Sequence, residues 1–145
     1  MWHFIGKFNR LSRCIGAYRA RRIDEGELLP HHHSLVFAIC REEGRSQDTL
    51  AQVLCLNKST VARSLAALED KGLVVRRPAA EDKRVLLVYP TEKMKALLPR
   101  VRTVAKEWNE AVTEGISEEE LAVCESVLTR MTEKAKALLE SEDGE

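Results

Sequence analysis

The fold is decided by residues 46–90, which read SQDTLAQVLCLNKSTVARSLAALEDKGLVVRRPAAEDKRVLLVYP. Ser46 and Asn57 each precede a run with the apolar spacing of a helix, and both are residue types that cap helix N-termini. They predict helices over 47–54 and 58–71, with a tight turn between them. Two helices joined in this way form a helix-turn-helix unit.

A hairpin is predicted directly after Gly72, which is a residue that ends helices. Its arms are the β-rich segments 73–77 and 84–89, its loop is 78–83, and Pro90 closes the second arm because proline has no N–H for a sheet. The hairpin carries four basic residues, Arg76, Arg77, Lys83 and Arg84. A helix that enters a groove, followed by a basic wing, is the layout of a winged helix-turn-helix that binds duplex DNA.

The second helix of this unit has one apolar face and one small, polar and basic face. On a helical wheel its apolar stripe falls within about 40° and consists of Val61, Leu65 and Leu68. Ser59, Arg63 and Ala66 occupy the opposite side, where the small Ala66 lets the helix lie close to a groove floor. Arg63 can pair with guanine N7 and O6 or with a phosphate.

The residues predicted to contact DNA lie at the two helix starts and on the wing: Ser46, Lys58, Ser59, Thr60, Arg63, Arg77, Lys83 and Arg84. The wing would reach the neighbouring minor groove, where negative potential favours arginine. Asp82 supports the wing in this hypothesis, because it stands two residues before Arg84 and can accept hydrogen bonds that direct the guanidinium. The alternative is a solvated helix face beside an ordinary exposed turn.

The net charge of the 145-residue chain is zero, so its total charge does not indicate a nucleic-acid partner. The distribution of charge is uneven, however. Residues 1–22 hold six basic and no acidic side chains, residues 57–90 hold seven basic and four acidic ones, and residues 113–145 hold three basic and ten acidic ones. DNA binding is compatible with the neutral sum if the acidic segment lies away from the groove.

Amphipathic helices are predicted on both sides of the central module, over 3–23, over 91–114 and from Ser117-Glu118-Glu119-Glu120, a capping box, onward. The apolar run at 35–40 indicates a short buried helix before the module. The stripes of the two terminal helices are narrow and have the heptad spacing of helix–helix seams. These helices are therefore expected to pack on each other and on a second copy of the chain.

The predicted fold is mainly α with a small β-hairpin wing. A winged helix-turn-helix region, 31–90, is continuous with helical dimerisation regions at 1–30 and 91–145. The interface of the expected homodimer uses residues 1–23 and 105–140.

Four cysteines, Cys14, Cys40, Cys55 and Cys124, form no CxxC pair and lie in or beside apolar helical patterns. Buried free thiols are expected, and a thiol that responds to oxidation is the alternative. No signal peptide is visible, and no apolar run is long enough to span a bilayer. We therefore expect the reducing cytoplasm as compartment and no membrane partner.

His31, His32 and His33 are consecutive, so they cannot all face one point on a helix. A polar loop and helix cap is the prediction, and a metal site completed by cysteine or carboxylates is the alternative. No nucleophile–base pair, paired catalytic carboxylates or phosphate-cradling glycine loop is visible. We therefore expect neither an enzyme nor a bound cofactor or metal.

These features resemble the MarR family of bacterial and archaeal transcriptional regulators, and the resemblance extends from about Phe4 to Leu139. Residues 50–93 are its most specific part. Asp82-Lys83-Arg84 is similar to the D-x-R wing motif of that family, Thr91-Glu92-Lys93 to the T-E-K helix start, and GISEEEL at 115–121 to the start of the last helix.

The resemblance implies an obligate homodimer of triangular outline whose two winged-helix lobes bind a pseudo-palindromic operator. It also implies a repressor released by a small anionic, often phenolic, effector or by thiol oxidation. Cys14 stands several residues too late for the reactive cysteine of the peroxide-sensing branch. A winged-helix module that binds proteins is the remaining alternative, but such modules usually lose the basic recognition face that this sequence keeps.

An effector pocket would lie between the first, second and long helices. The residues expected to line it are Tyr18, His32, Phe37 and Val101. A ligand there would change the spacing of the two recognition helices by shifting a population of conformers. The same four residues can equally be interpreted as core.

Overall fold

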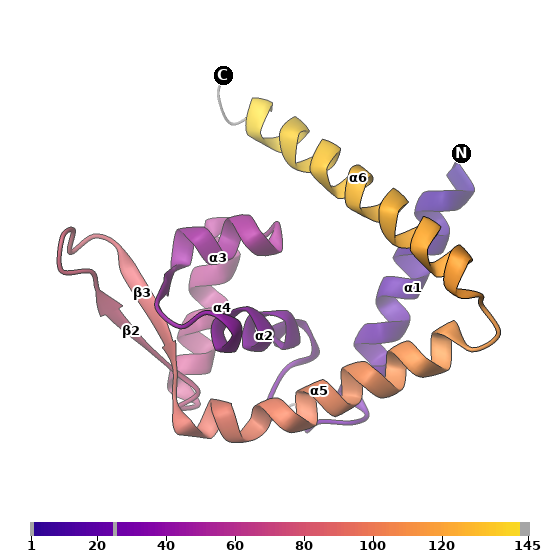
Figure 1. The fold of residues 1–145 in the computed structure, drawn as a ribbon. Coiled ribbons are helices and arrows are strands. Elements are labelled where there is room, and N and C mark those ends of the chain that lie inside the picture. Colours follow the sequence, from indigo (N-terminus) through magenta and orange to yellow (C-terminus); the bar gives the residue numbers. More distant parts are fainter. Residues whose placement is uncertain (1, 25, 143–145) are drawn as a thin grey trace. The chain divides into compact units, whose positions relative to one another are not determined.

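The computed structural model describes residues 2–24 and 26–142 and divides the chain into two compact units, Met1–Trp108 and Asn109–Glu145. The chain is mostly helical with a small three-stranded antiparallel sheet (Figure 1). Its elements follow in the order α1 (Trp2–Ala20), the 3-10 helix η1 (Pro30–His32), α2 (His33–Arg41), β1 (Arg45–Ser46), α3 (Gln47–Leu54), α4 (Lys58–Asp70), β2 (Val74–Pro78), β3 (Leu86–Pro90), α5 (Glu92–Thr113) and α6 (Glu118–Glu142).

The helix-turn-helix consists of α3 and α4, and both predicted caps are confirmed. Ser46 Oγ accepts a hydrogen bond from the Thr49 backbone N–H at 3.1 Å, and Asn57 Oδ1 accepts one from the Thr60 backbone N–H at 2.8 Å. Each cap satisfies a backbone donor that the first helical turn leaves free. Between the helices, Cys55 adopts the left-handed conformation with φ 53°, which turns the chain from α3 into α4.

The C-terminal end of α4 is closed by Gly72 and tied to the start of α5. Gly72 has φ 70°, and its N–H and that of Leu73 donate to the carbonyls of Glu69 and Leu68 at 2.8 and 2.9 Å, which is a Schellman motif. Thr91 Oγ1 donates to Gly72 O at 2.7 Å and also caps α5 by accepting from the Met94 N–H at 3.3 Å. The recognition helix and the long helix therefore share one hydrogen-bonded junction.

The sheet has the order β1-β3-β2, and β2 pairs with β3 from Val74↔Pro90 to Pro78↔Leu86. The predicted hairpin is confirmed, but its arms differ from the predicted segments by one or two residues. Arg84 was predicted to begin the second arm and instead lies in the loop, because strand pairing ends at Leu86. The third strand, β1, was missed because two residues are too few to leave an alternating pattern.

The core of the first unit lies among α2, α3, α4, the sheet and one face of α5. Its buried side chains include the predicted stripe of α4 and the stripe of α5 that faces inward: Val61, Leu65, Leu68, Met94, Leu97, Val101 and Val104. Five residues of α2, from His33 to Ile39, are buried, as expected for a short helix with an apolar run. Among the helices that the structure describes, none has the length and hydropathy needed to cross a bilayer.

The histidine run was predicted to be a polar loop and helix cap, and that prediction is wrong for two of its members. His32 and His33 are each only 1% exposed, and neither side chain makes a cap hydrogen bond. His32 ends η1 and His33 begins α2, and both are buried, while His31 stays exposed. His32 Nδ1 and His33 Nε2 have no hydrogen-bond partner among the described residues.

Burial makes this pair of imidazoles sensitive to acid. The pKa of His32 and that of His33 are both lowered from 6.5 to about 4, mainly by desolvation. The charges of His31 and Lys71 also lower the His32 pKa, and the charge of Arg19 also lowers the His33 pKa. Between these two pH values the unfolded chain binds more protons than the folded chain. The stability that the neutral rings contribute is therefore present above about pH 6.5 and is lost as the pH falls toward 4.

We expect the midpoint of thermal unfolding to fall over this pH window. A double variant, His32→Leu with His33→Leu, should lose part of the dependence, whereas His3→Gln on the exposed face of α1 should keep it. Nitrogen-15 NMR of the wild-type rings is the independent measurement, and both should remain neutral at pH 5.5. Rings that titrate near pH 6.5 would contradict the burial of this pair.

In the second unit, α6 begins with the predicted capping box. The Ser117 N–H donates to Glu120 Oε2 at 3.0 Å, and the Glu120 N–H donates to Ser117 Oγ at 3.2 Å. Several large apolar side chains on α6 are exposed in this chain, among them Val123, Leu128, Met131, Leu138 and Leu139. Inside the first unit, α1 likewise exposes Phe4, Ile5, Phe8 and Leu11.

Candidate nucleic-acid interface

The exposed face of α4 carries the polar and basic residues that the sequence assigned to a groove. Lys58, Ser59 and Arg63 are exposed and Thr60 is half-buried, while Val61 on the opposite side is fully buried. Because α4 packs by its apolar stripe, its N-terminal turn is left open to an approaching ligand, and the N-terminus of a helix favours anions such as phosphate.

An acidic neighbour that the sequence analysis did not identify lies beside this face. Lys58 Nζ lies 3.2 Å from Asp48 Oδ2, and both side chains are mostly exposed. An exposed ion pair of this kind contributes little to stability and can exchange partners. The ten-residue spacing across the turn leaves no recognisable pattern in the sequence, so only the packing of α3 on α4 reveals the pair.

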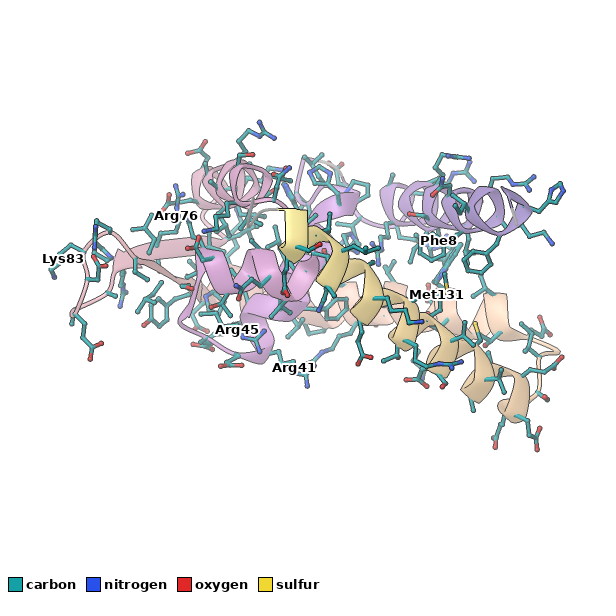
Figure 2. The ribbon with its side chains drawn as sticks, turned by 90° about the horizontal axis from the view of Figure 1, so that it is seen from above. Phe8, Arg41, Arg45, Arg76, Lys83 and Met131 are labelled. Carbon is teal, nitrogen blue, oxygen red and sulfur yellow. The ribbon has the colours of Figure 1, made fainter. Side chains whose placement is uncertain are left out.

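The wing presents an arginine that is held by its own loop. Arg84 donates to Asp82 through its backbone N–H at 3.0 Å, through Nε at 3.1 Å and through Nη2 at 3.2 Å. These bonds lower the pKa of the Asp82 carboxyl, while the Arg84 side chain remains 91% exposed. The predicted support of the wing by Asp82 is therefore present as a contact, and Lys83 extends from the tip of the hairpin (Figure 2).

The two adjacent arginines of β2 lie on opposite sides of the strand, as the alternation of strand side chains requires. Arg77 is exposed and its guanidinium lies over the ring of Tyr89, 5.4 Å from the centroid. Arg76 is directed toward the helices, where it contacts Glu69. Both were predicted to be basic residues of the hairpin, and of the two only Arg77 is exposed.

The hydroxyl of Ser46 is occupied in the folded chain. Its oxygen is the N-cap acceptor of α3 and lies 2.9 Å from Thr49 Oγ1, and the residue is half-buried. The structure thus places Lys58, Ser59, Thr60 and Arg63 on the first two turns of α4, and Lys83 with Arg84 on the wing loop. It gives Ser46 an evident structural role.

The four residues proposed to line an effector pocket lie in or against the core of the first unit. His32 and Val101 are fully buried, and Tyr18 and Phe37 are half-buried against the core. The Tyr18 hydroxyl donates to Glu107 Oε2 at 3.3 Å and accepts from Arg22 Nη2 at 3.0 Å. Packing accounts for all four positions, and the pocket stays a prediction.

The prediction of buried thiols is wrong for three of the four cysteines. Cys14, Cys55 and Cys124 are exposed, and Cys40 is half-buried. Cys55 is exposed because it forms the left-handed cap of α3, and the other two lie on helix faces that their own units leave open. In the described part of the chain, no three histidine, cysteine or acidic side chains are grouped so that they could hold a metal ion.

Comparison with known proteins agrees with this architecture. The family model of the MarR family matches residues 27–85. The uncharacterized HTH-type transcriptional regulator YybA of Bacillus subtilis (strain 168) is 28% identical over 93 residues, which are 64% of this chain and 62% of that protein. The match thus spans less than two thirds of the length of this relative.

Two solved structures are similar over nearly the whole chain. The transcriptional regulator PA3341 is 30% identical with a TM-score of 0.77, and the match covers 92% of this chain and 98% of that one. A MarR family transcriptional regulator from Listeria monocytogenes, solved in complex with a 26mer DNA, is 22% identical with a TM-score of 0.86, covering 92% of this chain and 89% of that one. By family match, identity and fold, the chain belongs to the MarR family of winged-helix transcriptional regulators.

Proposed function

We propose that this chain is a dimeric, sequence-specific DNA-binding transcriptional regulator that acts as a repressor on a pseudo-palindromic operator. The observation that carries the proposal is the open N-terminal face of α4, with Lys58, Ser59 and Arg63, in the same unit as the exposed Arg84 of the wing. The helix would enter a major groove, and the wing would lie over the adjacent minor groove.

The structural relative from Listeria monocytogenes supports the choice of ligand, since it was solved with DNA and shares the fold. Phosphate contacts by exposed lysines and arginines make affinity fall with salt. Selection of genomic fragments by the purified protein would test this proposal and return the operator sequence. If the selected fragments bind with an affinity that does not fall as the salt concentration rises, the proposal is contradicted.

A second copy of the chain is the partner that we infer for the exposed apolar faces of α1 and α6. The face of α1 combines Phe4, Phe8 and Leu11 with the basic surroundings of residues 1–22. The exposed apolar residues of α6 lie within the acidic segment 113–145. Opposite charges beside apolar stripes favour pairing between copies. Dimerisation would place two recognition helices one turn of DNA apart, about 34 Å.

Release by a small anionic or phenolic effector is proposed for the region of Tyr18, His32, Phe37 and Val101. Release by thiol oxidation is the second candidate, because Cys14, Cys55 and Cys124 are accessible in this chain. Four single Cys→Ser variants distinguish release by thiol oxidation from release by an effector. If all of them respond to oxidant like the wild type, the thiol candidate is eliminated.

The Arg84→Ala substitution should weaken operator binding by about 1–3 kcal/mol, as expected for loss of one good groove contact. Arg100→Ala is the matched control, because Arg100 is an exposed arginine of α5 that pairs with Glu27 away from the wing. The operator affinities of wild type, Arg84→Ala and Arg100→Ala are compared by fluorescence anisotropy at one salt concentration. Equal affinity of Arg84→Ala and wild type would remove the wing from the interface.

The Phe8→Glu substitution should convert the dimer into a monomer at micromolar concentration, because it places a charge in the proposed α1 seam. Val53→Glu is the control: Val53 is exposed to a similar extent, 46% against 51%, but lies on α3. Sedimentation equilibrium should give the monomer mass for the first variant and the dimer mass for the second. A dimeric Phe8→Glu variant would exclude α1 from the interface.

A further inference from the structure

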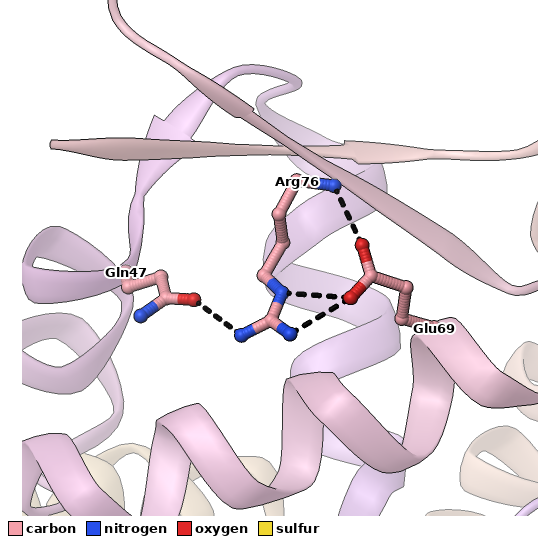
Figure 3. Close-up of polar contacts among 3 residues, drawn as sticks. All are labelled: Gln47, Glu69 and Arg76. Carbon is pink, nitrogen blue, oxygen red and sulfur yellow. Dashed lines mark hydrogen bonds and ion pairs between the residues drawn. The ribbon is translucent and has the colours of Figure 1, made fainter. Parts of the chain in front are cut away.

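Arg76 joins three elements of the winged helix-turn-helix: its own strand β2, the helix α4 and the helix α3 (Figure 3). Its Nε and Nη2 donate to Glu69 Oε2 at 3.1 and 2.7 Å, and its backbone N–H donates to Glu69 Oε1 at 3.3 Å. Its Nη1 donates to Gln47 Oε1 at 3.0 Å. One side chain of β2 is thereby bonded to the last turn of α4 and to the first residue of α3.

The environment of Arg76 suits a positioning contact. Its side chain is only 21% exposed, and the bonds from its guanidinium lower the pKa of the Glu69 carboxyl. Charge-assisted bonds with several donors define direction as well as distance, and partial burial shields them from salt. The neighbouring Arg77 is exposed on the other side of the strand, where its guanidinium lies over the ring of Tyr89.

Apart from this contact, backbone bonds at 72–73 tie the base of the hairpin to α4, and β1 pairs with β3 at Val88 and Leu87. The backbone at 72–73 and the pairing of β2 with β3 fix where the wing begins, while the wing loop lies at the far end of the strands. A small rotation at the base displaces Arg84 by an amount that grows with the length of the hairpin. A bond from the middle of β2 to Glu69 and Gln47 opposes that rotation.

We propose that Arg76 is a positioning residue that sets the angle between the wing and the recognition helix and thereby determines whether Arg84 reaches DNA. The inference rests on the proposed DNA-binding function. Arg76 itself touches no DNA in this account, and its effect is transmitted through the wing.

Glu69→Met gives the sharpest test, because a positioning role and a purely electrostatic role of Glu69 predict opposite changes in DNA affinity. If Glu69 were only an acidic residue near a phosphate backbone, its removal would tighten binding. If it holds Arg76, its removal should weaken binding by about fivefold or more. Glu27→Gln, which removes the acid of the exposed Glu27–Arg100 pair, is the control and should leave affinity unchanged. Tighter or unchanged binding by Glu69→Met would overturn the proposal.

Coupling to the wing distinguishes positioning from a general loss of stability. In the Arg76→Met background, Arg84→Ala should cost much less affinity than in the wild type, whereas Arg63→Ala on α4 should cost the same in both. The slope of log affinity against log salt concentration should be the same for Arg76→Met and wild type, because Arg76 contacts no phosphate in this proposal. Loss of a phosphate contact would reduce that slope by about one. The proposal would also be overturned if the losses of binding free energy caused by Arg76→Met and Arg84→Ala were additive in the double variant.

Two further controls distinguish a positioning effect from unfolding of a variant. Circular dichroism and thermal unfolding establish that each variant is folded, and Arg76→Lys, which keeps the charge but not the fork, replaces Arg76→Met if the latter does not fold. Arg76→Lys should bind as weakly as Arg76→Met, and wild-type affinity in this variant would refute positioning by the guanidinium. If wild type itself shows no salt-dependent DNA complex, the proposed function fails, and that outcome is separate from the results for the variants.

Discussion

The hydrogen-bonded junction between the end of α4 and the start of α5 is the constraint on which the arrangement of α4, the hairpin and α5 depends. Gly72 turns the chain out of α4 with a positive φ, and Thr91 and Lys93 donate to the carbonyls of Gly72 and Lys71 at 2.7 Å each. The two carbonyls that directly follow α4 are thus bonded by side chains at the start of α5, while the last carbonyls of α4 accept from the N–H groups of Lys71, Gly72 and Leu73. The start of α5 and the end of α4 are therefore held together by side-chain hydrogen bonds.

The placement of charges explains how a chain without net charge can present a basic surface. The basic side chains of α4 and of the wing loop are oriented outward by caps, by strand alternation and by the Asp82–Arg84 pair. The acidic excess belongs to residues 113–145, most of which lie in α6. Local placement of charge, rather than the sum, therefore determines which partner each surface can attract.

Much of this architecture could be predicted from the sequence because its signals are local. Cap residues set the starts of α3, α4 and α6, and the predicted bounds of Gln47–Leu54 are the observed ones. The predictions failed where a long-range contact decides the outcome. His32 and His33 are buried because η1 turns them inward, and Arg76 differs from Arg77 because β2 lies beside Glu69. Neither fact can be derived from the spacing of residues along the chain.

The measurement that tests the account most directly is a hydroxyl-radical footprint of the wild-type protein on its selected operator. A dimer that binds in this way should give two protected regions related by a dyad, with centres about 10 bp apart, each flanked by minor-groove protection from a wing. The flanking protection should disappear in the Arg84→Ala protein while the central regions remain. A single protected region without symmetry, or flanks that persist without Arg84, would contradict it.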